Sequence, residues 1–309
     1  MQVRSFYWYV LNKPLGSSSE LASKLDAHPF HPCGASQESS RGWVPAMSSE
    51  ELVYEAHGAQ LLMLKQEKRL LPASVVNDYL QDKVEQFEAA EGYTPSRKVR
   101  QQMKDDLIIE LLPKAFTKSM RVPVVIFPKQ GWLMVMAGSA KTADDLTAYL
   151  RECLGTLPVS LISSEISPSV QMTQWLSAPG ELPDDWVLGE EVELKDADDA
   201  VVKVRNQDLF SDELAVHMDN GKVVTKLALT WREQVSLLLH EDLSIKRVKL
   251  LLDEDAPAEA LDSDDGKYAH EFAVSCNWLV PMCQSLIKAL GGLDKALAAS
   301  QGRAFKQSA

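Results

Sequence analysis

The sequence has little cysteine: its 309 residues include only Cys33, Cys153, Cys276 and Cys283, and no two of these form a close metal-type pair. Sparse cysteines without such spacing are typical of reduced thiols in a reducing compartment. The sequence also lacks any apolar run approaching the ~20 residues of a membrane span, and its first apolar segment is too short for a signal peptide. We therefore expect a cytoplasmic protein without a membrane segment, stabilised by its core alone.

Sequence motifs for catalysis or cofactor binding are missing as well. The glycines at positions 34, 42, 291 and 292 match neither a phosphate-binding loop nor a dinucleotide fingerprint. Neither the serines nor His240 lies in the context of a nucleophile elbow. We therefore expect no cofactor and no catalytic residue, so the protein is not predicted to be an enzyme.

Two groups of residues could nevertheless hold metal. His28, His31 and Cys33 lie within six residues, but they lack a fourth zinc ligand and the histidines flank prolines in an apparent turn. The carboxylates at positions 253–255 and 262–265 could serve a two-metal nuclease, but their segment is interpreted as a solvated loop. We predict no metal site, and a metal-dependent nuclease remains the less favoured alternative.

The net charge of −12 is distributed unevenly. Residues 181–200 hold nine acidic residues and one basic residue, residues 252–265 hold seven acidic residues and no basic one, and both stretches are interpreted as solvated loops. Removing their −8 and −7 from −12 leaves +3 for the rest of the chain. Residues 96–130 alone hold eight basic residues against three acidic ones. A local basic surface can attract phosphate whatever the total charge.

Strand and helix patterns alternate along the chain, but hairpin signals recur, which predicts an α+β fold with mixed, largely antiparallel sheets. We expect a central α/β region from residues 1–71 and 120–180, and a second one from residues 181–309 with a C-terminal helix at 268–290. Residues 28–46 are interpreted as a loop. The predicted strands are at residues 3–11, 60–64, 122–127, 132–136, 157–162, 201–204, 222–231, 235–240 and 243–252, with further helices at 17–27, 141–154 and 211–220.

Residues 72–119 are predicted to form a projecting helical hairpin with a basic side. Pro72 suits the first turn of one helix, and Ser96 suits the cap of the next. Arg97 and Lys98 begin the second helix and are candidate DNA-binding residues. Phe116 follows the hairpin at the end of the arm.

Three predicted strands each place long cations on one face, because residues two apart in a strand share a face. The candidate DNA-binding side chains are Lys203, Arg205 and Gln207, then Lys222 and Lys226, then Arg247 and Lys249. On the middle strand we expect Val224 on the cationic face and Val223 on the opposite, apolar face. Such a surface suits phosphate contacts, which carry no sequence information. A polar outer face of a half-exposed sheet is the plainer interpretation.

Six distinctive motifs are FHPCG at 30–34, GWVP at 42–45, LLPKAF at 111–116, LGTLPV at 154–159, QDL at 207–209 and GKVVTKLAL at 221–229. They run in order over nearly the whole chain, and the last is long and particular. In these motifs the chain resembles the RdgC family of recombination-associated proteins.

The resemblance implies a ring-shaped, nucleoid-associated homodimer that encircles duplex DNA, also binds single strands, and limits the activity of the RecA recombinase. It implies a dimer contact through Phe116, beside Lys114. The family's cationic positions fall on Arg205, Asn206, Gln207, Lys222 and Lys226, where Asn206 replaces the lysine of some relatives. An alternative is a regulator that contacts the recombinase directly, with DNA binding incidental. A steep dependence of DNA binding on salt would favour the first interpretation.

Overall fold

The computed structural model describes residues 1–47, 50–206, 209, 212–251 and 264–294. The chain divides into two compact units. The first comprises Met1–Lys24, Pro45–Leu62 and Pro123–Ala309, and the second comprises Leu25–Val44 and Met63–Val122. The boundaries expected at residues 72 and 119 fall inside the second unit, and the boundary expected at residue 181 falls inside the first.

A seven-stranded sheet has the order β2-β4-β5-β6-β1-β7, with β3 paired to β4. Its strands are β1 (Tyr7–Leu11), β2 (Ser39–Val44), β3 (Val53–Ala56), β4 (Ala59–Arg69), β5 (Thr117–Phe127), β6 (Trp132–Val135) and β7 (Val159–Leu161). The pairings of β1 with β6 and of β5 with β6 are antiparallel, which confirms the hairpin predicted around Gly131. Helix α1 (Ser18–Leu25) follows β1, and α4 (Ala140–Leu154) begins at the cap Ser139 and buries Leu146 and Leu150.

The segment at residues 28–46 is not only a loop, as the sequence suggested. Strand β2 pairs with β4, whose extent is also longer than the predicted 60–64. Gly42 lets the backbone of Pro29 and Phe30 pass close to β2, because a Cβ atom there would lie 2.4 Å from the backbone of Phe30. A glycine at such a contact adds no side chain to the alternation of apolar and polar residues that marks a strand, which explains why the sequence did not reveal β2.

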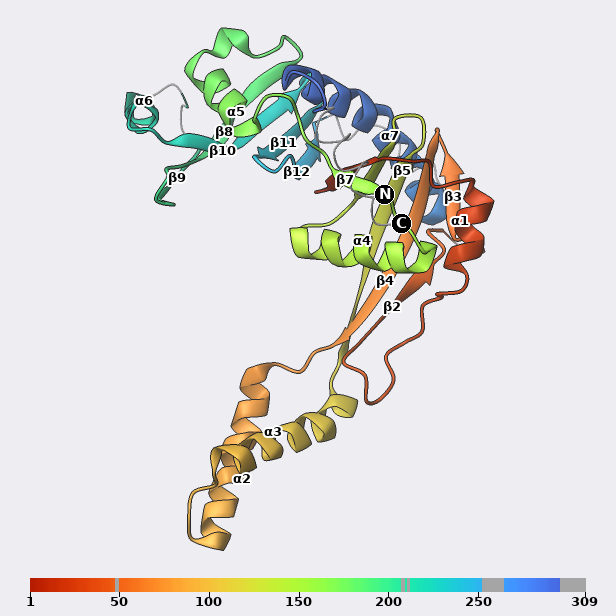
Figure 1. Cartoon of the computed structure of the whole chain (residues 1–309), viewed down its shortest axis with the longest axis vertical. Coiled ribbons are helices and arrows are strands. Elements are labelled where there is room, and N and C mark those ends of the chain that lie inside the picture. The colour runs from red at the N-terminus through yellow and green to blue at the C-terminus, as the bar shows by residue number, and fades with distance from the viewer. Residues whose placement is uncertain (48–49, 207–208, 210–211, 252–263, 295–309) are drawn as a thin grey trace, which may run out of the picture. The chain divides into compact units, whose positions relative to one another are not determined.

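The second sheet has five strands in the order β12-β11-β10-β8-β9, all antiparallel to their neighbours (Figure 1). They are β8 (Trp186–Lys195), β9 (Val201–Arg205), β10 (Val223–Trp231), β11 (Val235–His240) and β12 (Ile245–Leu250). The interpretation of residues 181–200 as a solvated loop was wrong, because β8 occupies half of that acidic stretch. Val192 and Leu194 are buried while the glutamates alternate with them, which is the pattern of a strand with one buried face.

Helices accompany this sheet in the first unit. Helix α5 (Pro168–Ser177) packs against β10, where the hydroxyl of Thr173 accepts the N–H of Val224 at 2.8 Å. The others are η2 (Pro179–Glu181), α6 (Asp212–Asp219) and α7 (Asp264–Ala289), which includes Pro281 as predicted. Trp186 of β8 donates to the Ser285 hydroxyl of α7. No helix in the described residues is long and apolar enough to cross a membrane.

The second unit holds α2 (Ala73–Glu91), α3 (Arg97–Leu111) and the short helix η1 (Leu112–Lys114). The predicted cap Ser96 is confirmed, since its hydroxyl accepts the N–H of Val99. Pro72 marks the start of α2 as expected, but it is the N-cap and not a residue of the first turn. The two helices pack through a cluster of Leu80, Val84 and Leu107 (Figure 1). Leu80 and Val84 are four residues apart and therefore lie on one face of α2.

Candidate functional site

Two glutamates of β8 each bind two cations from other strands of the sheet. Glu193 lies opposite Lys203 of β9 and Lys226 of β10, and its carboxylate is 3.1 Å and 2.8 Å from their ammonium groups. Glu191 lies opposite Arg205, which it binds at 3.0 Å, and it also binds Arg247 of β12. We call these two glutamates and four cations the β8 ion-pair cluster. It brings together four of the predicted DNA-binding residues.

The cations of the cluster are more exposed than the carboxylates. Lys203, Arg205 and Arg247 have side chains 51–57% exposed and Lys226 31%, against 22% for Glu191 and 14% for Glu193. Burial raises the pKa of Glu193, but hydrogen bonds from Lys226 and Lys203 more than offset this and keep its pKa below the usual value. Glu193 is therefore ionised at neutral pH. The six side chains carry four positive and two negative charges, so the cluster has a net charge of +2.

A β-bulge changes the face assignment on β10. The pairing with β8 shifts register between Val224 and Lys226, so the two-residue alternation is interrupted there. Val224 is buried and Val223 is 40% exposed, the reverse of the prediction. The prediction was wrong because the bulge arises from pairing with β8, a strand that the sequence did not reveal. Lys226 remains on the polar face.

Lys222, which precedes the bulge, differs from the other predicted cations. Its side chain is only 12% exposed and binds the Asp196 carboxylate. Its ammonium also donates to the carbonyl of Ala200 at 3.0 Å. Lys222, just before β10, thus binds the turn between β8 and β9, and little of its side chain faces solvent.

Arg247 and Lys249 are exposed on β12, but a register shift separates them. Lys249 pairs opposite Ser236 and Lys246 opposite Leu238, which places both lysines on one face, since Ser236 and Leu238 are two residues apart. Arg247 has a left-handed backbone (φ 50°) within this irregularity. This conformation accompanies its ion pair with Glu191 on a strand that is not its neighbour.

Asn206 follows β9 and also has a left-handed backbone, with φ of 54°. Asparagine adopts this conformation more readily than lysine, which is a physical reason for the departure from the lysine of some relatives. Gln207, a predicted DNA-binding residue, lies outside the described residues.

Arg97 and Lys98 are exposed in the first turn of α3, in the second unit. No acidic residue lies in that turn. Cations near a helix N-terminus repel the positive end of the helix dipole, so helix stability does not explain their position.

Phe116 is 86% exposed, so its side chain does not pack within this chain. It follows η1 and directly precedes β5, and its carbonyl accepts the N–H of Leu70 at 2.7 Å. Phe116 therefore lies where the chain enters and leaves the helix pair, and not at the turn between α2 and α3. Lys114, which is 67% exposed, pairs with Glu110 at 3.4 Å.

A network of carbonyl groups surrounds Arg69, close to Phe116 in the second unit. The Arg69 guanidinium donates to the carbonyls of Gly34, Pro113 and Ala115 at 3.0–3.4 Å. The contact joins the 28–38 segment to the end of η1, and so fixes the backbone next to Phe116.

Residues that could support metal or acid–base chemistry do not converge in the described part of the chain. No group of three or more His, Cys, Asp or Glu side chains there could hold a metal ion. Cys33 instead donates its backbone N–H to the Glu67 carboxylate at 2.8 Å. The carboxylates of residues 253–255 and of Asp262 lie outside the described residues.

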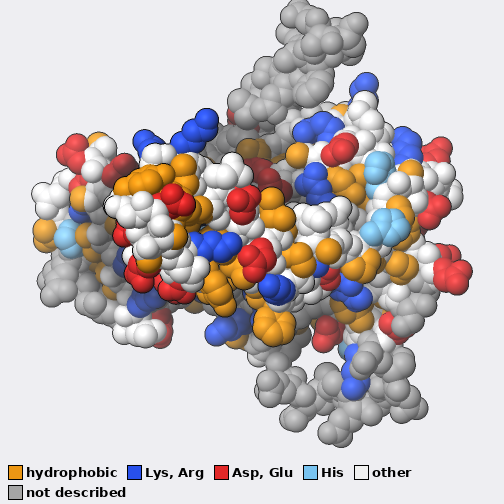
Figure 2. Space-filling model, turned by 90° about the horizontal axis from the view of Figure 1, so that it is seen from below, with side chains coloured by type: hydrophobic (Ala, Val, Ile, Leu, Met, Phe, Trp, Pro, Cys, Tyr) orange, Lys and Arg blue, Asp and Glu red, His pale blue; other side chains and the backbone are white. Residues whose placement is uncertain are grey.

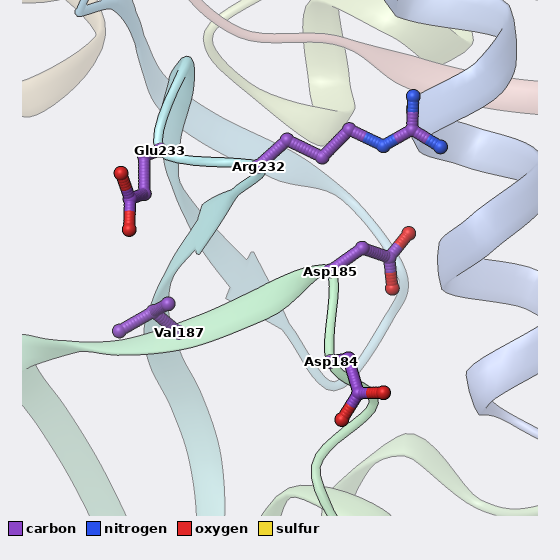
Figure 3. Close-up of a pocket in the computed structure, with 5 residues that line it drawn as sticks. All are labelled: Asp184, Asp185, Val187, Arg232 and Glu233. Atoms are coloured by element: carbon purple, nitrogen blue, oxygen red, sulfur yellow. The ribbon is translucent and has the colours of Figure 1, made fainter.

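An open hollow of about 370 Å³ lies beside the turn between β10 and β11 (Figure 3). It is lined by Asp184, Asp185, Val187, Arg232 and Glu233. Asp185 accepts hydrogen bonds from the Trp231 indole at 3.1 Å and the Ser285 hydroxyl at 2.6 Å. The acidic side chains in Figure 3 point in different directions and do not meet at a common centre. The hollow therefore offers no catalytic arrangement.

Sequence reasoning missed three residues of this sheet face. Glu191 and Glu193 were hidden in the acidic run, although the alternation Glu-Val-Glu-Leu signals a strand. His240 lies opposite Lys226, and burial followed by the charge of Lys226 lowers its pKa to about 4. On the face shown in Figure 2, basic side chains (blue) and acidic side chains (red) are intermixed rather than segregated.

The fold and this cluster define an α+β protein with two antiparallel sheets, one of which carries cations ordered by glutamates. A family model described as "Putative exonuclease, RdgC" matches residues 1–293. The Recombination-associated protein RdgC of Tolumonas auensis is 37% identical over 299 residues, which is 94% of this chain and 99% of that protein. The relative of the same name from Aeromonas hydrophila is 35% identical over 312 residues, 96% of this chain and 100% of its own. This chain belongs to the RdgC family of recombination-associated proteins.

Proposed function

We propose that this protein binds DNA through its phosphate backbone, without sequence preference, and acts in recombination by limiting the RecA recombinase. The β8 ion-pair cluster is the observation that carries the proposal. Its four cations exceed its two carboxylates, and the cations are the more exposed partners. Lysine and arginine at such a surface neutralise phosphates and release counterions. Membership in a family of recombination-associated proteins supports DNA as the ligand.

The side chains of the cluster retain hydrogen-bond donors for a phosphate. Arg205 uses its Nε–H for Glu191 and has no other partner among the described residues, which leaves its terminal NH₂ groups available. Lys203 makes one ion pair there, with Glu193, and an ammonium group has three donors. Contacts of this kind position a nucleic acid and do not read its bases. Lys249 is an exposed cation that extends the proposed contact surface, and Lys222 has a supporting role. Arg97 and Lys98 form a separate proposed DNA contact in the second unit.

In the proposed assembly two copies of the chain close a ring around duplex DNA. The exposure of Phe116 supports this, because large aromatic side chains are favoured anchors of interfaces. Phe116 and Lys114, at the base of the α2–α3 helix pair, then contact the partner. We propose that the protein acts by occupying DNA and not by catalysis.

Charge-removing variants test the proposal. Lys203→Gln with Lys226→Gln should weaken binding to duplexes of every sequence and reduce the log–log salt slope by roughly 1 for each lost phosphate contact. The matched control is Lys24→Gln with Lys141→Gln, two exposed lysines on α1 and α4. In this control pair, the DNA affinity and the salt slope should stay near those of the wild type. Equal effects of both pairs in folded proteins would contradict the assignment of the cluster.

A further inference from the structure

Glu191 and Glu193 occupy positions where a bound nucleic acid would place negative charge. Each carboxylate lies between two cations from different strands, as a phosphate would. The two glutamates are two residues apart on one face of β8, which corresponds to about 6.6–6.8 Å along a strand. This is close to the separation of neighbouring phosphates along one nucleic-acid strand.

From this arrangement we propose that Glu191 and Glu193 compete with two adjacent phosphates of one DNA strand for the four cations, and that they thereby lower the affinity of the cluster for DNA. The inference rests on the proposed function and adds a regulation of the same site. A phosphate that approaches Lys203 or Arg205 meets a cation whose charge is already shared with a glutamate. The cluster therefore attracts a phosphate with a net charge of +2 and not with the charge of all four cations.

The positions of the carboxylates favour competition over simple support. They are more buried than the cations, so they remain beneath the cation tips when a ligand arrives from solvent. At close range, like charges of a phosphate and a carboxylate repel, and this repulsion is stronger near a protein surface than in bulk water. The two glutamates thus weaken the attraction of this face of the sheet for a phosphate.

The arrangement also predicts how salt acts. Cations that are paired internally hold fewer counterions, so binding releases fewer ions and the salt slope is shallower than the number of cations suggests. Removing both carboxylates should expose two more positive charges to counterions. The slope should then steepen by up to roughly 1.8, from about 0.9 for each phosphate.

The test compares the full-length Glu191→Gln, Glu193→Gln double variant with wild type on a random-sequence duplex. Glu190→Gln is the control, because Glu190 is an exposed neighbour on the same strand and is not a member of the β8 ion-pair cluster. The double variant should bind more tightly at low salt. Its advantage should shrink roughly tenfold as salt rises from ~50 mM to ~200 mM, as expected for the steeper slope. The control should change both quantities much less.

Thermal melting establishes that each variant is folded. A single variant, Glu193→Gln, provides the measurement if the double variant does not fold, and half the slope change is then expected. A folded variant that binds no more tightly than the Glu190→Gln control overturns the inference, and so does weaker binding, which would make the glutamates supports and not competitors. If wild-type protein shows no salt-dependent DNA binding, the proposed function itself fails. The two failures are therefore distinguishable.

Discussion

Lys226 of β10 and Glu193 of β8 lie directly opposite each other, with 2.8 Å between the ammonium group and the carboxylate. The same carboxylate binds Lys203 from the other side, so one glutamate connects three adjacent strands. Ion pairs whose cations remain in contact with solvent contribute modestly to stability. Their main consequence is to fix the positions of cation tips at the surface of the sheet.

Lys222→Ala should lower the stability of the protein more than its affinity for DNA. The side chain is largely buried, and its loss leaves Asp196 and the Ala200 carbonyl without their partner. We expect a decrease of about 1–3 kcal/mol in the free energy of unfolding, measured by urea denaturation. Lys249→Ala, at an exposed lysine, should have almost no effect on stability. A Lys222→Ala variant that is as stable as wild type would contradict the structural role.

Phe116→Ser should leave the fold of the chain intact and speed the release of closed circular DNA. The aromatic side chain of Phe116 is exposed, so its removal creates no cavity within the chain. If Phe116 closes a ring, circles should dissociate faster at fixed salt, because they offer no end from which the protein can slide. Ile109→Ser is the control, since Ile109 is 70% exposed on α3. Equal dissociation rates for wild type and Phe116→Ser, with unchanged melting, would show that Phe116 does not gate a ring.

His240 should make the protein less stable in mild acid. Its pKa in the folded state is about 4, because the ring is buried and Lys226 is close, while Asp242 and Glu193 only partly offset these effects. The unfolded chain takes up a proton near pH 6.5, so unfolding is favoured increasingly as pH falls from about 6.5 to 4. We expect a loss of about 1 kcal/mol between pH 7 and pH 5 once the partial exposure of the ring is allowed for.

His240→Gln should flatten this dependence, which urea unfolding at several pH values will measure. His270→Gln, at an exposed histidine of α7, serves as the control and should leave the profile unchanged. A pH profile that is identical in wild type and His240→Gln would refute the assignment.

Purified protein with magnesium or manganese should leave labelled linear and circular DNA intact. The described residues contain no cluster of metal-ligating side chains, and the hollow beside Asp185 has no convergent carboxylates. The description of the family model as an exonuclease makes this assay informative. Cleavage that co-purifies with the protein and disappears in Asp253→Asn or Asp262→Asn would show that the protein is a nuclease.

Local signals in the sequence predicted the parts of the fold that depend on neighbouring residues. Pro72 and Ser96 mark the starts of α2 and α3, and Gly131 marks the β5–β6 turn, because each effect acts within one turn of the chain. The alternation of Lys203 and Arg205 likewise placed both on an exposed face of β9.

Pairing between distant residues explains what the sequence did not reveal. Strand β8 was missed because its acidic composition obscured the alternation of Val192 and Leu194. The bulge near Lys226 depends on the register between β10 and β8, which no local pattern encodes. The pairs that Glu191 and Glu193 form span 10 to 56 residues, so the cationic face could be predicted, but its carboxylates could not.

The most direct test of the account is the affinity of wild-type protein for duplexes of equal length and different sequence, measured across a range of salt concentrations. The account predicts parallel straight lines of log affinity against log salt, with nearly equal affinities and a slope of about −0.9 for each phosphate neutralised. A slope near zero, or a large preference for one sequence, would contradict binding through the phosphate backbone.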